Sequence, residues 1–266
     1  MLDDRWEDAA AYDRFMGRWS RQLASRFLAW LEMKPGAHWL EIGCGTGSLT
    51  RAILEEARPQ SVTACDTAKD FVNYCAENLL YANLRVVAIP TGDLPAREGG
   101  YDAVVSSLVL NFLPDPIQAL RQMRKACAPG GWVAACVWDY SEGMEFLRFF
   151  WDAAIALDPN AARLHEGSRF PICRPDALRH ALGAADLEAV TVDPITIPTV
   201  FTGFEEYWGS FLNSPGPAPT YVSSLSQEAR QRLAGRLRAE VSSAPEGSIH
   251  LQARAWAVKG MNRRRS

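Results

Sequence analysis

The sequence predicts an α/β fold in which helices wind both faces of a mostly parallel sheet. Three observations favour it: short apolar runs alternate with helical patterns, a glycine-rich turn follows the first run, and an aspartate ends the second. Strands separated by helices form parallel sheets with right-handed crossovers. A ligand is therefore expected beyond the carboxyl ends of the strands, near the switch in strand order.

The first half of the chain carries the alternation. Residues 4–32 have apolar side chains three or four positions apart, which predicts one or two amphipathic helices ahead of the sheet. The segments that follow are predicted, in order, as strand HWLEI, helix TGSLTRAILEEA, strand SVTACD, helix AKDFVNYCAENLLYA, strand LRVVA, strand YDAVVSSLVL, helix PIQALRQMRKAC, an APGG turn and strand WVAACVWD.

The pattern changes after Asp139. The predicted elements are helices EFLRFFWDAAIAL and RPDALRHALGAA, strand EAVTVDPITIPTVF, helix FEEYWGSFL, a loop at NSPGPAPT, helix SQEARQRLAGRLRAEV and a final strand, SIHLQARAWAVKG. We expect one domain in three parts: a helical cap (1–34), a ligand-binding core (35–140), and a region (141–266) that supplies covering helices and the last two strands of the same sheet.

Composition narrows the class of protein. The chain has 266 residues, of which 48% are hydrophobic, and a net charge of −3, so no global field attracts nucleic acid or anionic lipid. Its six cysteines form no C-x-x-C and its histidines do not cluster, which argues against a disulfide framework or a metal site. We expect a cytoplasmic protein, monomeric or homodimeric, without nucleic-acid binding or membrane insertion.

The glycine-rich turn is the most informative motif. Gly43, Gly45 and Gly47 allow a tight turn and let a ligand approach the backbone. The spacing is G-x-G-x-G, whereas dinucleotide enzymes use G-x-G-x-x-G. Glu41, two residues earlier, disfavours a pyrophosphate but suits an ammonium group or a bound water. A ligand that carries both a carboxylate and an amino group fits this turn better than a phosphate.

A second acidic residue supports a nucleoside-containing ligand. Asp66 ends the second predicted strand, where a carboxylate can accept hydrogen bonds from ribose hydroxyls, and Thr67 follows it. This position suits either nucleotide class. The combination with the glycine turn, a Tyr101-Asp102 pair and the A-P-G-G turn is far more specific than the glycines alone.

With these motifs the sequence resembles the class I S-adenosylmethionine-dependent methyltransferases, particularly the small-molecule branch of ubiquinone-biosynthesis type (methyltransferase type 11). The resemblance rests on LEIGCGTG, VTACD, YDAVVSSLVLNFLPDP and LRQMRKACAPGGWVAACVWD. It implies that Glu41 and the turn from Gly43 to Gly47, including Cys44, hold the methionine part of S-adenosylmethionine, and that Asp66 holds the ribose. It also implies a Rossmann-like seven-stranded sheet whose last strand is antiparallel.

The loop after the third strand departs from the family pattern, which is Gly-Asp-Ala followed by Leu-Pro. Aligning the Leu-Pro pair at 94–95 places the usual adenine-contacting Asp on Pro90, whereas aligning Asp93 shortens the loop. Asp93 and Leu94 are therefore candidates for the adenine contact. Thr91 or a backbone group is the alternative, with Asp93 as a solvated turn residue.

The segment after the fourth strand is expected to face the ligand. Ser107 at its start is a cofactor-contact candidate, as side chains and carbonyls there commonly face the ligand. Asn111 and Phe112 stand where the family often has a His or Asn lining the methyl-transfer site. The alternative for Asn111 is a turn or helix-start role before Pro114.

The segment YDRFMGRW, residues 12–19, resembles the N-terminal cap of this branch, in which an aromatic and a basic residue close over the cofactor. Tyr12 is the candidate for contact with cofactor or substrate. Arg14 and Arg18 are candidates for pairing with a cofactor carboxylate. Phe15 and Trp19 are expected to pack the helix onto the core.

No residue can be named the catalyst from the sequence. Methyl transfer from a sulfonium is an in-line displacement on an activated donor, so alignment is the main requirement, and only an acceptor that must lose a proton needs a base. His165 in RLHEGSRF is the histidine to test as a base, with Asp139 and Tyr140 as competitors. Tyr12 and Asn111 complete the candidates.

Aromatic residues gather around 138–151 and 204–211. Such residues at helical spacing more often form a core, but these segments are expected to cover the strand ends, which favours an apolar or aromatic acceptor. The leading hypothesis is methyl transfer to O, N or C of a small, partly apolar metabolite, such as an aromatic or isoprenoid natural product. The alternatives are an NAD(P)-dependent oxidoreductase and a non-catalytic ligand-binding protein.

Overall fold

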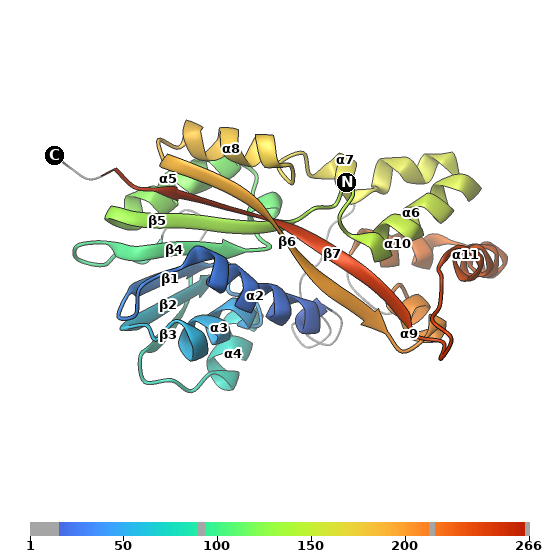
Figure 1. The fold of residues 1–266 in the computed structure, drawn as a ribbon, viewed down its shortest axis with the longest axis horizontal. Coiled ribbons are helices and arrows are strands. Elements are labelled where there is room, and N and C mark those ends of the chain that lie inside the picture. Colours follow the sequence, from blue (N-terminus) through green and yellow to red (C-terminus); the bar gives the residue numbers. More distant parts are fainter. Residues whose placement is uncertain (1–15, 90–93, 213–215, 264–266) are drawn as a thin grey trace. The chain divides into compact units, whose positions relative to one another are not determined.

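A seven-stranded sheet organises the computed structural model, which describes residues 16–89, 94–212 and 216–263. The strand order is β3-β2-β1-β4-β5-β7-β6 (Figure 1). The strands are β1 (His38–Ile42), β2 (Ser61–Asp66), β3 (Leu84–Ala88), β4 (Tyr101–Ser107), β5 (Cys127–Trp138), β6 (Glu188–Phe201) and β7 (Ile249–Met261). The order reverses between β1 and β4, so the carboxyl ends of these two strands mark the expected ligand position.

The strand directions confirm the predicted mixed sheet. Each neighbouring pair from β3 across to β5 is parallel. The last strand, β7, runs against β5: the amide of Gly130 near the start of β5 donates to Asn262 just after β7, while the amide of Asp139 just after β5 donates to Arg254 within β7. The Rossmann-like fold with an antiparallel last strand is therefore confirmed.

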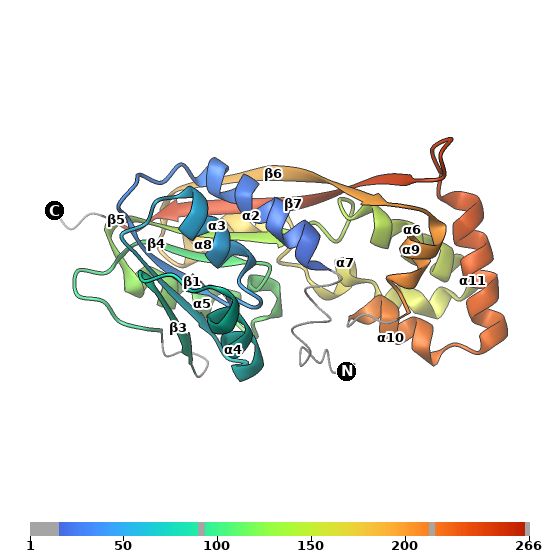
Figure 2. The same cartoon turned by 90° about the horizontal axis from the view of Figure 1, so that it is seen from below.

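Helices follow most of the predicted segments. They are α2 (Arg18–Leu31), α3 (Ser48–Glu56), α4 (Lys69–Asn78), η2 (Leu110–Phe112), α5 (Pro116–Ala126), α6 (Glu145–Leu157), η3 (Pro159–Leu164), α7 (Glu166–Arg169), α8 (Pro175–Ala184), α9 (Phe204–Gly209), α10 (Pro217–Ser224) and α11 (Gln227–Glu240). Contacts place α2 beside α3 and α5 beside α8, as Figure 2 shows for the first pair.

Two sequence-based assignments are wrong. The predicted loop at NSPGPAPT contains the start of α10, because Pro217 occupies the first helical turn, where a missing N–H costs nothing. The predicted APGG turn is part of β5, which begins at Cys127. Gly130 adopts a φ of 81° there, and the pairing with β4 shifts register between Tyr101 and Ala103. A local bulge thus replaces the turn.

The described residues divide into two compact units. The sheet unit consists of 16–89, 94–137, 174–195 and 255–263. The helical unit consists of 138–173, 196–212 and 216–254, and so includes the end of β6 and the start of β7.

The sheet unit has a continuous apolar interior. Trp39 and Leu40 of β1 and Val104 and Val105 of β4 are all fully buried, as expected for central strands covered on both faces. Lys259 of β7 also contacts α2 within this unit. Its ammonium donates a hydrogen bond to the carbonyl oxygen of Trp30 at 3.2 Å and lies over the Trp30 ring. This contact ties the last strand to α2.

The helical unit has an aromatic core. The ring of Phe150 in α6 stacks on Phe211 at 4.4 Å between centroids and meets Trp151 edge-on at 5.0 Å. Phe146, Phe201 and Phe211 are also fully buried, and the hydroxyl of Tyr207 donates to the carbonyl oxygen of Phe146 at 2.8 Å. These side chains pack on one another, so they no longer support the inference of an aromatic acceptor.

We expect Phe150→Ala to lower the free energy of unfolding by about 3–5 kcal/mol, because it leaves a cavity in this core. Leu157→Ala in the same helix is the matched control: its side chain is 44% exposed, and the expected change lies within about 0.5 kcal/mol. Guanidinium unfolding followed by tryptophan fluorescence measures both. Equal losses in the two variants would contradict the central position of Phe150.

Candidate functional site

The glycine turn lies at the carboxyl end of β1, where all three glycines adopt the left-handed region. The φ angles of Gly43, Gly45 and Gly47 are 72°, 51° and 84°. The amides of Gly43 and Cys44 both donate to the carbonyl oxygen of Cys65, at 2.8 and 3.0 Å. The neighbouring strand therefore holds the start of the turn in place.

The three glycines are needed for different reasons. A Cβ on Gly43 would lie 2.4 Å from Val109, and one on Gly47 would lie 2.8 Å from Leu79, so both positions are closely packed. At Gly45 a Cβ would meet no atom within 4 Å. The backbone at Gly45 is therefore open to a ligand on the side where other residues carry a side chain.

Asp66 connects the end of β2 to this turn. Its Oδ2 accepts a hydrogen bond from the amide of Gly45 at 3.0 Å, and its Oδ1 accepts one from the amide of Ala68 at 3.0 Å. Each carboxylate oxygen retains a lone pair for a further donor, such as a hydroxyl group. Thr67 beside it is exposed.

Glu41 supports the turn from within the core. It is 1% exposed, and Thr50 of α3 donates a hydrogen bond to its Oε2 at 2.6 Å. Burial raises the pKa of Glu41 well above its usual range, although the hydrogen bond from Thr50 opposes the shift. Sequence reasoning missed Thr50, whose only signal was a polar residue among the apolar positions of an amphipathic helix.

Strain and an unpartnered amide mark the segment after β4. Leu108 adopts a φ of 62° while its amide donates to the carbonyl oxygen of Cys136 at 2.8 Å. The Ser107 hydroxyl lies 3.2 Å from the sulfur of Cys136. Asn111 in η2 is 8% exposed, and its Nδ2 has no hydrogen-bond partner among the described residues. A left-handed leucine and an unpaired buried donor are both costly, and such features cluster at functional sites.

Several predicted site residues lie outside the described part of the chain: Tyr12, Arg14, Phe15, Pro90, Thr91 and Asp93. Leu94 is half-buried directly after the second of these gaps. Arg18 begins α2, and its guanidinium carbon lies 4.7 Å from the centroid of the Trp19 ring.

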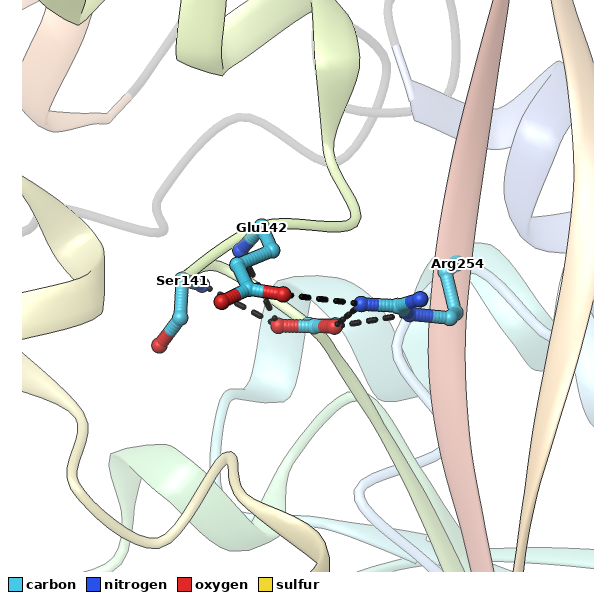
Figure 3. Close-up of polar contacts among 4 residues, drawn as sticks. Ser141, Glu142 and Arg254 are labelled. Carbon is cyan, nitrogen blue, oxygen red and sulfur yellow. Dashed lines mark hydrogen bonds and ion pairs between the residues drawn. The ribbon is translucent and has the colours of Figure 1, made fainter.

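Asp139 is engaged in an ion pair with Arg254 of β7, which Figure 3 labels together with Ser141 and Glu142. Its Oδ2 lies 2.6 Å from Nη2 and 2.8 Å from Nε of Arg254, and its Oδ1 accepts hydrogen bonds from the amides of Ser141 and Glu142, each at 3.2 Å. A guanidinium and two amides already occupy both oxygens of this carboxylate, so the geometry favours a structural role. Sequence reasoning missed Arg254, because its partner becomes visible only once β5 and β7 are paired.

The other two base candidates are also in contact with neighbours. The ring of Tyr140 lies 5.5 Å from that of Phe170. Nδ1 of His165 accepts a hydrogen bond from the amide of Gly167 at 2.9 Å and so caps α7. Since that lone pair is occupied, Nε2 carries the proton of the neutral ring. His165 would have to break its cap before accepting a second proton.

Among the described residues, no helix is long and apolar enough to cross a membrane. The same residues also contain no group of three or more His, Cys, Asp or Glu side chains that could hold a metal ion.

We expect acid to destabilise the wild type relative to His165→Asn, which retains a cap acceptor for Gly167 but does not titrate. Burial lowers the pKa of His165, so the unfolded chain, with a pKa of about 6.5, binds a proton first. Stability is therefore full above that value and is lost as pH falls through the folded pKa. Urea unfolding at several pH values from 7 to 5 measures this, and a constant difference between the two proteins would contradict it.

The comparisons agree with the resemblance seen in the motifs. A family model described as a methyltransferase domain matches residues 40–133. A ubiquinone biosynthesis O-methyltransferase of Xanthomonas campestris is 33% identical over 102 residues, 36% of this chain and 41% of the relative. A malonyl-[acyl-carrier protein] O-methyltransferase of Halorhodospira halophila is 31% identical over 186 residues, 68% of this chain and 58% of the relative.

The fold has solved counterparts. The crystal structure of a putative methyltransferase from Bacillus halodurans matches with a TM-score of 0.57 and 13% identity, over 90% of this chain and 98% of that one. The chain spans 41% and 58% of the length of the two curated relatives above. Residues 40–133 therefore match a methyltransferase domain, and the motifs and strand order around them support the class I type of this domain.

Proposed function

We propose that this chain transfers a methyl group from S-adenosylmethionine to O, N or C of a small, partly apolar metabolite. The observation that carries the proposal is the open backbone at Gly45, whose amide is held by Asp66 at the carboxyl end of the central strands. The turn falls within the matched methyltransferase domain. That match also favours methyl transfer over the NAD(P)-dependent oxidoreductase alternative.

The residues around the turn suit the two ends of this donor. Gly47, the N-cap of α3, provides no side-chain cap, so the first amides of the helix suit a carboxylate. Glu41 suits the cationic ammonium, because a nearby positive charge stabilises its ionised form. Asp66 and Thr67 stand where ribose hydroxyls would be held, and Ser107 and Leu94 are further contact candidates.

Adenine and cap contacts are assigned to residues outside the described part of the chain. We propose Asp93, or the Pro90–Thr91 stretch, for the adenine amino group. We propose Tyr12 for a contact with cofactor or acceptor.

The donor supplies a methyl group that is already activated on a cationic sulfur. The chain then has to orient the acceptor and exclude water, and orientation of this kind provides about 7–11 kcal/mol of barrier reduction. Asn111 is the described residue best suited to orient an oxygen atom, because it offers a buried N–H that no described residue uses. His165 and Asp139 act in this proposal as structural groups.

Composition and the named relatives indicate the class of the acceptor. The balance of 28 basic and 31 acidic residues disfavours a polyanionic acceptor. Both named relatives are O-methyltransferases, which favours an oxygen acceptor. A cytoplasmic location and a monomeric or homodimeric state are part of the same proposal.

We expect Gly45→Arg to abolish binding of S-adenosylhomocysteine in isothermal titration calorimetry while the far-ultraviolet circular dichroism spectrum stays the same. The arginine would fill the open space at the turn, where its left-handed backbone also disfavours a side chain. Gly235→Arg is the matched control, because that exposed glycine of α11 also has open space beside it. Wild-type protein that binds no S-adenosylhomocysteine, when folded and free of copurified ligand, would contradict the proposal.

We expect Asn111→Leu to reduce kcat/KM about tenfold or more, the value of one hydrogen bond to the ligand, without lowering stability. Replacement of a buried, unpaired amide by an apolar group of similar size is neutral or stabilising. Methyl-transfer assays and thermal unfolding measure the two effects. A variant that loses stability but not activity would show that Asn111 is structural.

A further inference from the structure

Two buried thiols lie where the glycine turn meets α4. Cys44, the second residue of the turn, is 5% exposed, and Cys75 of α4 is fully buried. They belong to one buried cluster with Ala64 and Leu79. The pKa of the Cys44 thiol is raised and that of the Cys75 thiol is lowered, each chiefly through the other thiol. The two side chains pack in the same cluster, although 31 positions separate them in the sequence.

The turn rests directly on the sulfur of Cys75. A Cβ on Gly47 would lie 3.0 Å from that sulfur, so the backbone of the turn and α4 are in close contact. The same sulfur lies 4.0 Å from the hydroxyl of Thr50, which donates to Glu41. A shift of the Cys75 sulfur would therefore displace Gly47 in the turn and Thr50, the hydrogen-bond partner of Glu41.

The pKa of Cys75 is shifted in the opposite direction from those of the other buried cysteines. Burial raises the pKa of Cys65, Cys127, Cys136 and Cys173 to about 12. For Cys75 the hydrogen bond with Cys44, and next the one with Thr50, outweigh burial, and its pKa is lowered. The thiolate is the reactive form of cysteine, so Cys75 is the nucleophile of the pair.

We propose that Cys44 and Cys75 form an oxidation site, and that a disulfide between them blocks donor binding at the glycine turn. The oxidant is a hydroperoxide, with hydrogen peroxide as the simplest. The thiolate of Cys75 attacks one peroxide oxygen, hydroxide leaves, and a sulfenic acid forms. The sulfur of Cys44 then displaces hydroxide from that sulfenic acid, and its proton goes into the water released. The two thiols lose two electrons and two protons, and the peroxide becomes two waters.

The structure explains why this bond would affect the turn. A disulfide holds its sulfurs about 2.0 Å apart, closer than two thiols that only pack against each other, so the turn and α4 must move toward each other. Gly47 already packs against α4 and the Gly45 amide is bound by Asp66, so the backbone groups that face the donor have to shift. The consequence for donor binding rests on the proposed function, whereas the disulfide itself does not.

The test compares reduced and peroxide-treated full-length protein. We expect a mass loss of about 2 Da, a cross-linked peptide that joins Cys44 to Cys75, and recovery with dithiothreitol. The Kd for S-adenosylhomocysteine should rise about tenfold or more in the oxidised form. Cross-links between other cysteines, sulfinic acid without a cross-link, or a cross-linked protein with an unchanged Kd would each overturn the proposal.

Two variants complete the experiment. Cys75→Ser should form no cross-link, and peroxide should leave its Kd unchanged. Cys127→Ser on β5 removes a buried cysteine away from the turn and should respond as the wild type does. If reduced wild-type protein binds no S-adenosylhomocysteine, the proposed function fails, while the peptide map still decides whether the thiol pair exists.

Discussion

The left-handed backbone of the turn from Gly43 to Gly47 is the constraint on which the rest of the site depends. It ends β1 abruptly and starts α3, and it is held by the carbonyl oxygen of Cys65 and the carboxylate of Asp66 on the next strand. Because β1 and β2 are parallel and in register, these anchors arrive at the same edge of the sheet. The position of the turn is thus a consequence of the parallel pairing of β1 with β2 and of three residues without a Cβ.

The helical unit is stabilised by a core of aromatic side chains. Its helices surround an interior of stacked aromatic rings, so the side chains that are most conspicuous in the sequence are used for stability. The carboxylate of Asp139 is likewise engaged within the protein, because it pairs with Arg254 and accepts a hydrogen bond from the amide of Ser141. Among the described residues, the fold also leaves a left-handed Leu108 and an unpartnered buried amide at Asn111 in the segment after β4.

The sequence predicted secondary structure correctly where local patterns determine it and failed where long-range strand pairing does. The strands HWLEI and SVTACD appear as predicted, since apolar runs between glycine-rich turns have few other solutions. The APGG segment became strand because Cys127 could pair with Tyr101, a contact invisible to local propensity. Likewise α10 begins in a proline-rich stretch that local rules describe equally well as a loop or as a first helical turn.

The sequence by itself determined the fold class and the position of the glycine-rich turn after the first strand, because glycine spacing and hydrophobic period are local properties of the chain. Only the tertiary structure decided how the polar groups are used. Asp139 forms an ion pair with Arg254, Glu41 accepts a hydrogen bond from Thr50, and Cys44 and Cys75 shift each other's pKa. No local sequence pattern encodes these pairs. The physical reason is that burial and pairing, which set the charge and reactivity of a side chain, arise only when separate elements pack together.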